Sequence, residues 1–357
     1  MPKTPLLLIA FLLCLQNLPA QIDFGKSSPK HPQLAEMDQE IESGAYERIT
    51  SVLVAQHGKL VHEAYFNGAD ESSKHNTRSA TKTIATLLTG IAIDQGHIAS
   101  EKDPILKYLQ HKLPLQNPDP RKEEMSIEDL LTMSSLMECS DDDQFSRGNE
   151  NRMYLIEDWT KFFLDLPIRA FPFGPGPSEQ PYGRAFSYCS AGSATMAEVV
   201  ESATGMPAHK FAQQHLLAPL GITDYKLHYT PMGILNTAGG SEYRSRDFLK
   251  LIQMCLQGGK WDGKQIISEK WLKKATTPKA RAWEGMEYGY LFWLKAFGED
   301  GTAPGFSMAG NGGQKVLAIP SMDLAVVITT TNYNNRKAHG YTDALMKKYI
   351  VPAMKGK

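Results

Sequence analysis

Ser79-Ala80-Thr81-Lys82 places a hydroxyl and an amine three residues apart, at the start of an apolar run that predicts a helix. Side chains three residues apart on a helix share a face. A serine hydroxyl is a weak nucleophile and needs a neighbouring base, which a lysine supplies where its surroundings favour the neutral amine. The stretch therefore predicts a nucleophile and its base near a helix N-terminus. The same residues also fit an N-cap serine followed by a solvated lysine.

A second stretch with this spacing, Ser27-Ser28-Pro29-Lys30, lacks the helical context. Pro29 lies inside it, in a polar segment without apolar periodicity, so no helix is expected there. After Ser79, apolar side chains recur at helical spacing, and Gly96 is the expected end of the helix. The context therefore selects Ser79 and Lys82 as the S-x-x-K motif.

The composition is that of an ordinary globular protein with room for a large core, because 42% of the 357 residues are hydrophobic and the net charge is -1. A near-neutral chain without a basic stripe argues against a nucleic-acid partner. The ten histidines are scattered, and His62-Glu63 lacks the second histidine of a zinc-binding H-E-x-x-H. We therefore expect no metal and no cofactor.

The N-terminus has the pattern of a secretory signal peptide. Lys3 precedes an apolar run over residues 6–15, and Pro19-Ala20 offers a cleavage site. We expect a signal peptide over 1–20, with a retained anchor as the alternative, then a linker over 21–32 and a periplasmic or secreted protein. No later stretch is long and apolar enough for a membrane span.

The mature chain would keep three cysteines, an odd number: Cys139, Cys189 and Cys255. Each is expected to be a buried small residue. A Cys139–Cys189 bridge is the alternative, because both residues lie near candidate site segments.

The order of predicted elements indicates an α/β fold of the α+β type, with a mainly antiparallel sheet flanked by helices. Early strands at 51–55 and 59–66 are joined by a His57-Gly58 hairpin turn, and a helix is expected over 342–354. Late strands are predicted at 289–295, 303–309, 314–320 and 324–331. We predict one domain over 33–357, with a sheet subdomain (33–78 and 236–357) and an inserted helical subdomain (79–235).

Two loops are expected near the substrate cleft, which would lie between the sheet and the helical region. The charged segment 141–152 predicts a solvated surface loop. The proline-rich segment 167–183 predicts a long ordered loop or lid. The 141–152 loop and residues 171–183 would form the rim, and Trp159 and Trp283 fit either its lining or the core.

Two further segments complete the pattern: Phe186-Ser187-Tyr188-Cys189-Ser190, and Met308 to Gln314. With Ser79 to Lys82 and Leu130 to Ser135, they resemble the serine β-lactamase-like superfamily over about residues 34–355. The nearest branch holds class C β-lactamases, DD-peptidases, serine esterases and 6-aminohexanoate-dimer hydrolases. The resemblance implies a β-lactamase/transpeptidase-like fold.

The resemblance also implies roles for three side chains. Ser79 would be the acylated nucleophile, Lys82 would take its proton or orient its hydrogen bonds, and Tyr188 would be the first residue of the Y-x-N motif. A phenol beside an ammonium can share its proton, so such a pair can serve a serine without a histidine. Taken alone, Tyr188 also fits a core tyrosine with a bonded hydroxyl.

The chain departs from the family pattern twice. Gly310-Asn311-Gly312-Gly313-Gln314 stands in place of the usual K-T-G or H-x-G and is typical of the esterase and amide-hydrolase branch. The backbone amide of Asn311, or else that of Met308, would pair with that of Ser79 as an oxyanion hole, with Gly310, Gly312 and Ser190 near the substrate. Taken alone, the glycines also fit a hairpin turn.

The second departure is Ser190, which stands where the family has an asparagine and cannot donate an amide hydrogen bond. We therefore predict a serine hydrolase that cleaves a small ester, amide or peptide through an acyl-enzyme. A β-lactamase or DD-carboxypeptidase is the first alternative. A non-catalytic binding protein of the same fold is the second.

Overall fold

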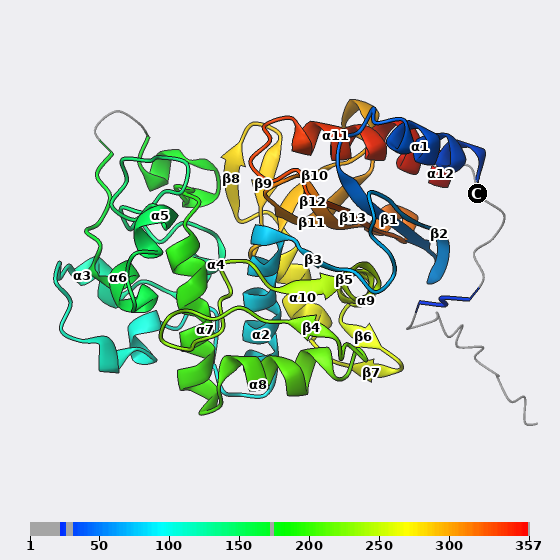
Figure 1. Ribbon diagram of the computed structural model, residues 1–357. Coiled ribbons are helices and arrows are strands. Elements are labelled where there is room, and N and C mark those ends of the chain that lie inside the picture. The colour runs from blue at the N-terminus through cyan, green and yellow to red at the C-terminus, as the bar shows by residue number, and fades with distance from the viewer. Residues whose placement is uncertain (1–21, 26–30, 172–174, 356–357) are drawn as a thin grey trace, which may run out of the picture.

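The computed structural model describes residues 22–25, 31–171 and 175–355. The predicted signal peptide, half of the predicted linker and the Ser27–Lys30 stretch lie outside these residues. Figure 1 shows a large sheet covered by helices, with a mostly helical region beside it. The expected fold class is confirmed.

The main sheet of the described residues is antiparallel throughout, in the order β2-β1-β13-β12-β11-β10-β9-β8. Its strands are β1 Ile49–Gln56, β2 Lys59–Tyr65, β8 Ala280–Trp283, β9 Met286–Tyr288, β10 Trp293–Ala296, β11 Pro304–Gly310, β12 Gln314–Ile319 and β13 Leu324–Thr330. Central β1 and β13 are buried along their whole length, as their apolar runs require. The two chain ends thus build one sheet, with β1 paired to β13.

Helices cover both faces of this sheet. On one face lie α1 Pro32–Glu42, α11 Ala338–Leu345 and α12 Val351–Lys355, side by side in Figure 1. Their apolar side chains form one core cluster with the strands. On the other face α9 Ser245–Leu256 packs against β1, β12 and β13.

The second and larger core joins the sheet to the helical region. Its central helix, α2 Lys82–Asp94, is buried from Lys82 to Ala92 and packs against α7 Ser190–Thr204. The other elements are α3 Pro120–Glu123, α4 Ile127–Leu131, α5 Glu150–Met153, α6 Trp159–Asp165, α8 Ala208–Ala212 and α10 Glu269–Ala275, with short strands β3 Lys74–Asn76, β4 Tyr225–Lys226, β5 Glu242–Arg244, β6 Lys260–Trp261 and β7 Lys264–Gln265.

Two predicted boundaries are wrong. The strand predicted over 289–295 begins only at Trp293, because the preceding backbone turns towards helices: Tyr290 donates to the Ala275 carbonyl and Leu291 to that of Leu131. The closing helix begins at Ala338 rather than Thr342.

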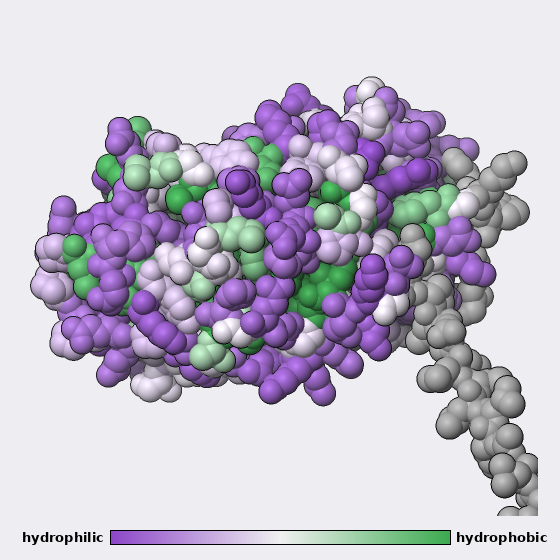
Figure 2. Space-filling view, turned by 90° about the horizontal axis from the view of Figure 1, so that it is seen from below, coloured by the Kyte–Doolittle hydropathy of each residue, from purple (hydrophilic) through white to green (hydrophobic). Residues whose placement is uncertain are grey.

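The surface is mostly hydrophilic on the face drawn in Figure 2, where apolar side chains appear in separate patches. Across residues 22–25, 31–171 and 175–355, no helix has both the length and the apolar character needed to cross a membrane.

Cys139 and Cys189 form a disulfide, with a Cα–Cα distance of 5.5 Å, whereas Cys255 is a buried free thiol. All three cysteines are buried, as expected, and the alternative of a Cys139–Cys189 bridge is confirmed. The bond joins Cys139, just before the 141–152 loop, to the residue between Tyr188 and Ser190.

Replacing both bridged cysteines with serine should lower the free energy of unfolding by up to about 4 kcal/mol, because the bond closes a loop of 50 residues in the unfolded chain. Denaturant unfolding measures this loss. Reduction of the Cys255→Ala protein, whose bridge is intact, should cause a similar loss. Equal stability of the bridged and unbridged proteins would contradict the expectation.

Candidate active site

Ser79 lies in a short 3-10 helix, Arg78–Thr81, that leads directly into α2. Arg78 adopts a left-handed conformation (φ 53°), and its backbone N–H donates to the Asn76 side chain at 3.0 Å. The Thr81 hydroxyl donates to the Arg78 carbonyl at 2.6 Å. A non-glycine residue with positive φ stores strain that its neighbours must hold, so this turn fixes Ser79 at the amino end of the helix.

Lys82 is buried, with 2% of its surface exposed, so the solvated-lysine alternative is wrong. Its Nζ donates to Ser79 Oγ at 3.2 Å, to Ser190 Oγ at 2.8 Å and to the Ala238 carbonyl at 2.5 Å. An ammonium has three N–H donors, and three acceptors surround this one. Burial lowers the pKa of Lys82, and the carboxylates of Asp141 and Glu150 oppose that shift.

The Tyr188 ring packs between Lys82 and Trp293. Lys82 Nζ lies 5.1 Å from the centroid of its ring, which stacks on Trp293 at 5.6 Å. Burial raises the pKa of the Tyr188 phenol, and the nearby Ser79 side chain opposes that rise. The phenol is therefore protonated at neutral pH, while the neighbouring amine is destabilised as a cation.

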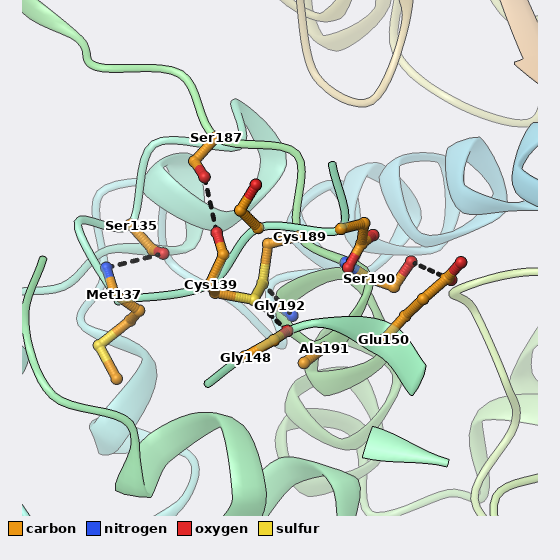
Figure 3. The surroundings of a disulfide bond; sticks show 12 residues. Ser135, Met137, Cys139, Gly148, Glu150, Ser187, Cys189, Ser190, Ala191 and Gly192 are labelled. Atoms are coloured by element: carbon orange, nitrogen blue, oxygen red, sulfur yellow. Dashed lines mark hydrogen bonds between the residues drawn. A yellow bond between two sulfur atoms is a disulfide. The ribbon is translucent and has the colours of Figure 1, made fainter. Parts of the chain in front are cut away.

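The loop after Cys139 turns inward, so its description as a solvated surface loop is wrong for two of its acids. Asp141 donates its N–H to the Tyr188 carbonyl at 2.8 Å, and its Oδ2 accepts the Ser190 N–H at 2.9 Å. The Ser190 hydroxyl donates to Glu150 Oε2 at 3.2 Å (Figure 3). Burial raises the pKa of Asp141 to about 6. Asp142 and Asp143 are exposed, as expected.

Gly310 brings the glycine-rich turn against the Ser79 segment. A Cβ at this position would lie 1.9 Å from the Thr77 carbonyl oxygen and 3.1 Å from the Ser79 nitrogen. Only glycine permits this approach. The backbone on either side of Gly310 is therefore beside the Ser79 amide, where an oxyanion hole would need it.

The turn after Gly310 is anchored to β13. The Thr330 hydroxyl donates to the Gly312 carbonyl, and the Gln314 side chain pairs with the Thr330 backbone in both directions, at 2.8 and 3.0 Å. The Asn311 side chain pairs with Asn334 at 2.8 Å, whereas the other oxyanion candidate, Met308, is buried in the core and paired with Val316.

Sequence reasoning missed three groups that the structure places around Lys82: the Ala238 carbonyl, Asp141 and Glu150. The Ala238 segment has no catalytic side chain. The sequence feature that could have indicated its close approach to the Ser79 turn is Gly239, where a Cβ would lie 3.2 Å from the Arg78 carbonyl oxygen. Of the two tryptophans considered for the cleft, Trp159 is buried in the core and Trp283 is 54% exposed, beside Trp293.

Asp141→Asn should stabilise the protein at pH 8 and leave its stability almost unchanged at pH 4. The folded-state pKa of about 6 lies above the usual value of 3.8, so the unfolded chain releases its proton first and stability falls as pH rises through 6. The gain at pH 8 should be at most about 3 kcal/mol. Thermal unfolding at both pH values measures it, and a destabilised variant at pH 8 would contradict it.

Comparison with known proteins places this geometry in a family. The family model named Beta-lactamase matches residues 37–349. The 6-aminohexanoate-dimer hydrolase of Paenarthrobacter ureafaciens is 22% identical over 257 residues, which cover 70% of this chain. The match spans 62% of that relative, so the chain aligns with less than two thirds of its length.

Solved structures share the fold at low identity. A Bacillus anthracis protein, provisionally named a 6-aminohexanoate-dimer hydrolase, has a TM-score of 0.70 at 18% identity, covering 95% of this chain and 86% of that one. A family VIII carboxylesterase has a TM-score of 0.66 at 18% identity, covering 90% and 98%. With the match over residues 37–349, the chain belongs to the beta-lactamase family.

Proposed function

We propose that the protein cleaves an ester or amide bond of a small substrate through an acyl-enzyme on Ser79. One observation carries the proposal: the Ser79 hydroxyl accepts a hydrogen bond from the buried Lys82 amine, which lies 5.1 Å from the centroid of the Tyr188 ring. An alcohol held between an amine with a lowered pKa and a neutral phenol has a base and an acid beside it.

Acylation would begin when Lys82, in its neutral form, takes the Ser79 proton as Oγ bonds to the substrate carbonyl carbon. The tetrahedral intermediate would then collapse, breaking the bond to the leaving alcohol or amine. Tyr188 would give its proton to that leaving group and recover one from Lys82. Water would attack the acyl-enzyme, lose a proton to the same pair, and release the acid and Ser79.

The oxyanion of each intermediate would be stabilised by the backbone amides of Ser79 and Asn311. The close approach of Gly310 to the Ser79 nitrogen supports this pairing, and the anchored turn would keep the second donor in place before the substrate arrives. Preorganised donors of this kind contribute several kcal/mol to acyl transfer. Ser190, Gly310 and Gly312 would lie beside the bound substrate.

Two features favour an esterase or amidase over a β-lactamase or DD-carboxypeptidase. Strand β11 has no lysine or arginine to meet a substrate carboxylate, and Ser190 lacks the amide of the usual asparagine. The names of the relatives, an amide-dimer hydrolase and a carboxylesterase, agree with this choice. The predicted signal peptide makes the periplasm or the exterior the proposed location.

Ser79→Ala should abolish labelling by a fluorophosphonate probe and lower p-nitrophenyl butyrate turnover by about 10⁴-fold or more, because the nucleophile is lost. Intact mass and peptide mapping locate the adduct. Tyr188→Phe should retain slow labelling at Ser79 while turnover falls at least about 100-fold. Labelling that persists in Ser79→Ala would contradict the proposal. A folded wild type that no acylating probe labels would favour the non-catalytic alternative.

Gly310→Ala should lower turnover far more than Gly340→Ala, whose Cβ would meet no atom within 4 Å. The added methyl must push β11 away from the Ser79 turn and so separate the two oxyanion donors. Removal of one such donor costs about 100- to 1,000-fold in kcat. Steady-state kinetics, with circular dichroism to verify folding, measure both variants. Equal activities would place the oxyanion hole elsewhere.

A further inference from the structure

We propose that Glu150, acting through the hydroxyl of Ser190, is the positioning residue that holds Lys82 in place to serve Ser79. This inference rests on the proposed function, since it assigns Glu150 and Ser190 a part in the same reaction. The charged loop that carries Glu150 would then be part of the catalytic apparatus.

The hydrogen bonds form a directed chain. Lys82 Nζ donates to Ser190 Oγ at 2.8 Å, and the Ser190 hydroxyl donates its one proton to Glu150 Oε2 at 3.2 Å. A hydroxyl can otherwise rotate and act as donor or acceptor. Because the carboxylate takes the proton, the Ser190 oxygen must present a lone pair to Lys82.

This arrangement explains how a serine can stand where the related enzymes have an asparagine. An amide carbonyl is an acceptor whatever surrounds it, whereas a hydroxyl becomes a dependable acceptor only when a second group takes its hydrogen. Glu150 supplies that second group. Ser190 and the inward-facing Glu150 would therefore do together what the amide does alone in those enzymes.

The chain is built to keep Glu150 at this point. Asn149 caps α5, and its side-chain amide donates to the carbonyls of Ser140, Asp141 and Asp143 at 3.1–3.3 Å, which closes the loop on itself. Gly148 packs so tightly that a Cβ there would lie 2.7 Å from the Cys139 Cα.

The disulfide then links this closed loop covalently to the segment that contains Ser190. Cys139 immediately precedes the loop that contains Glu150, and Cys189 immediately precedes Ser190. The disulfide therefore links the Glu150 loop to the Ser190 segment (Figure 3). Ser187 also donates its hydroxyl to the Cys139 carbonyl at 2.6 Å. The carboxylate and the hydroxyl therefore belong to one crosslinked unit.

Several titratable groups face this unit. Lys82 faces Asp141, Glu150 and the Tyr188 phenol. Glu150 also lies near Asp142, and the Tyr154 hydroxyl donates to it at 3.4 Å. A carboxylate near an ammonium favours the charged form. Loss of the Glu150 charge should therefore move the titration of Lys82 to lower pH, whichever limb of the activity profile that titration controls.

The first test is a double-mutant cycle on the full-length protein. Glu150→Ala and Ser190→Ala should each lower kcat for p-nitrophenyl butyrate about 10- to 100-fold, because removal of a residue that orients a functional group commonly has an effect of this size. The double variant should be no worse than Ser190→Ala, because Glu150 acts through that hydroxyl. Glu157→Gln, an exposed acid after the same helix, is the matched control and should behave as wild type. Losses that multiply in the double variant would overturn the proposal.

The second test separates a positioning role from a structural one. Glu150→Gln removes the charge but keeps an acceptor oxygen, so the kcat/KM limb controlled by Lys82 should move down by about 1 pH unit. The same shift should appear in the NMR titration of Lys82 in protein labelled with [ε-¹³C]lysine, its signal assigned with Lys82→Arg. An unmoved titration would overturn the proposal.

The NMR readout does not depend on turnover, so the two proposals can fail separately. A wild type that no acylating probe labels, but whose Lys82 titration shifts in Glu150→Gln, would reject the proposed function and retain the hydrogen-bonded chain. If the wild type is active, and the Glu150 variants have the same Lys82 titration and the same activity as the wild type, the positioning role alone would be rejected.

Discussion

The site depends on one interaction, the burial of the Lys82 amine among oxygen acceptors. An amine removed from water is costly unless each N–H finds a partner. Here one partner, Ser79, lies three residues away in the sequence, and the other two, Ser190 and the Ala238 carbonyl, come from distant parts of the chain. The helical region and the late part of the chain must therefore meet the start of α2 within hydrogen-bonding distance. The contacts that provide hydrogen-bond acceptors for the Lys82 amine are therefore the same contacts that assemble the site.

The structure meets this requirement by combining rigid elements with close backbone approach. Helix α2 is buried on all sides and carries Lys82 at its first position. Strand β11 approaches the Ser79 turn through Gly310, where no side chain fits, and the turn that follows is anchored by the Gln314 side chain. Positions that look permissive in sequence, because they are glycines, are those where the geometry is least tolerant.

Much of the fold could be predicted because its signals are local. The His57-Gly58 hairpin and the strands ending the chain follow from alternation and turn residues, and the run after Ser79 has helical spacing. The motif order also pointed to Tyr188 beside Ser79 and Lys82, and the structure places the Lys82 amine 3.2 Å from the Ser79 hydroxyl and 5.1 Å from the Tyr188 ring centroid. The strand predicted from residue 289 failed because tertiary contacts to Ala275 and Leu131 outweigh local propensity.

The partners of Lys82 could not be predicted in the same way. A backbone carbonyl such as that of Ala238 has no side-chain signature, and Glu150 sits among acids that are typical of a solvated loop. Cys189 separates the phenol from the Ser190 hydroxyl, so the crosslink forms inside the motif itself. A chain that folded among cytosolic reductants would lack this bond, and the Cys139 and Cys189 segments would then be held together by noncovalent contacts alone.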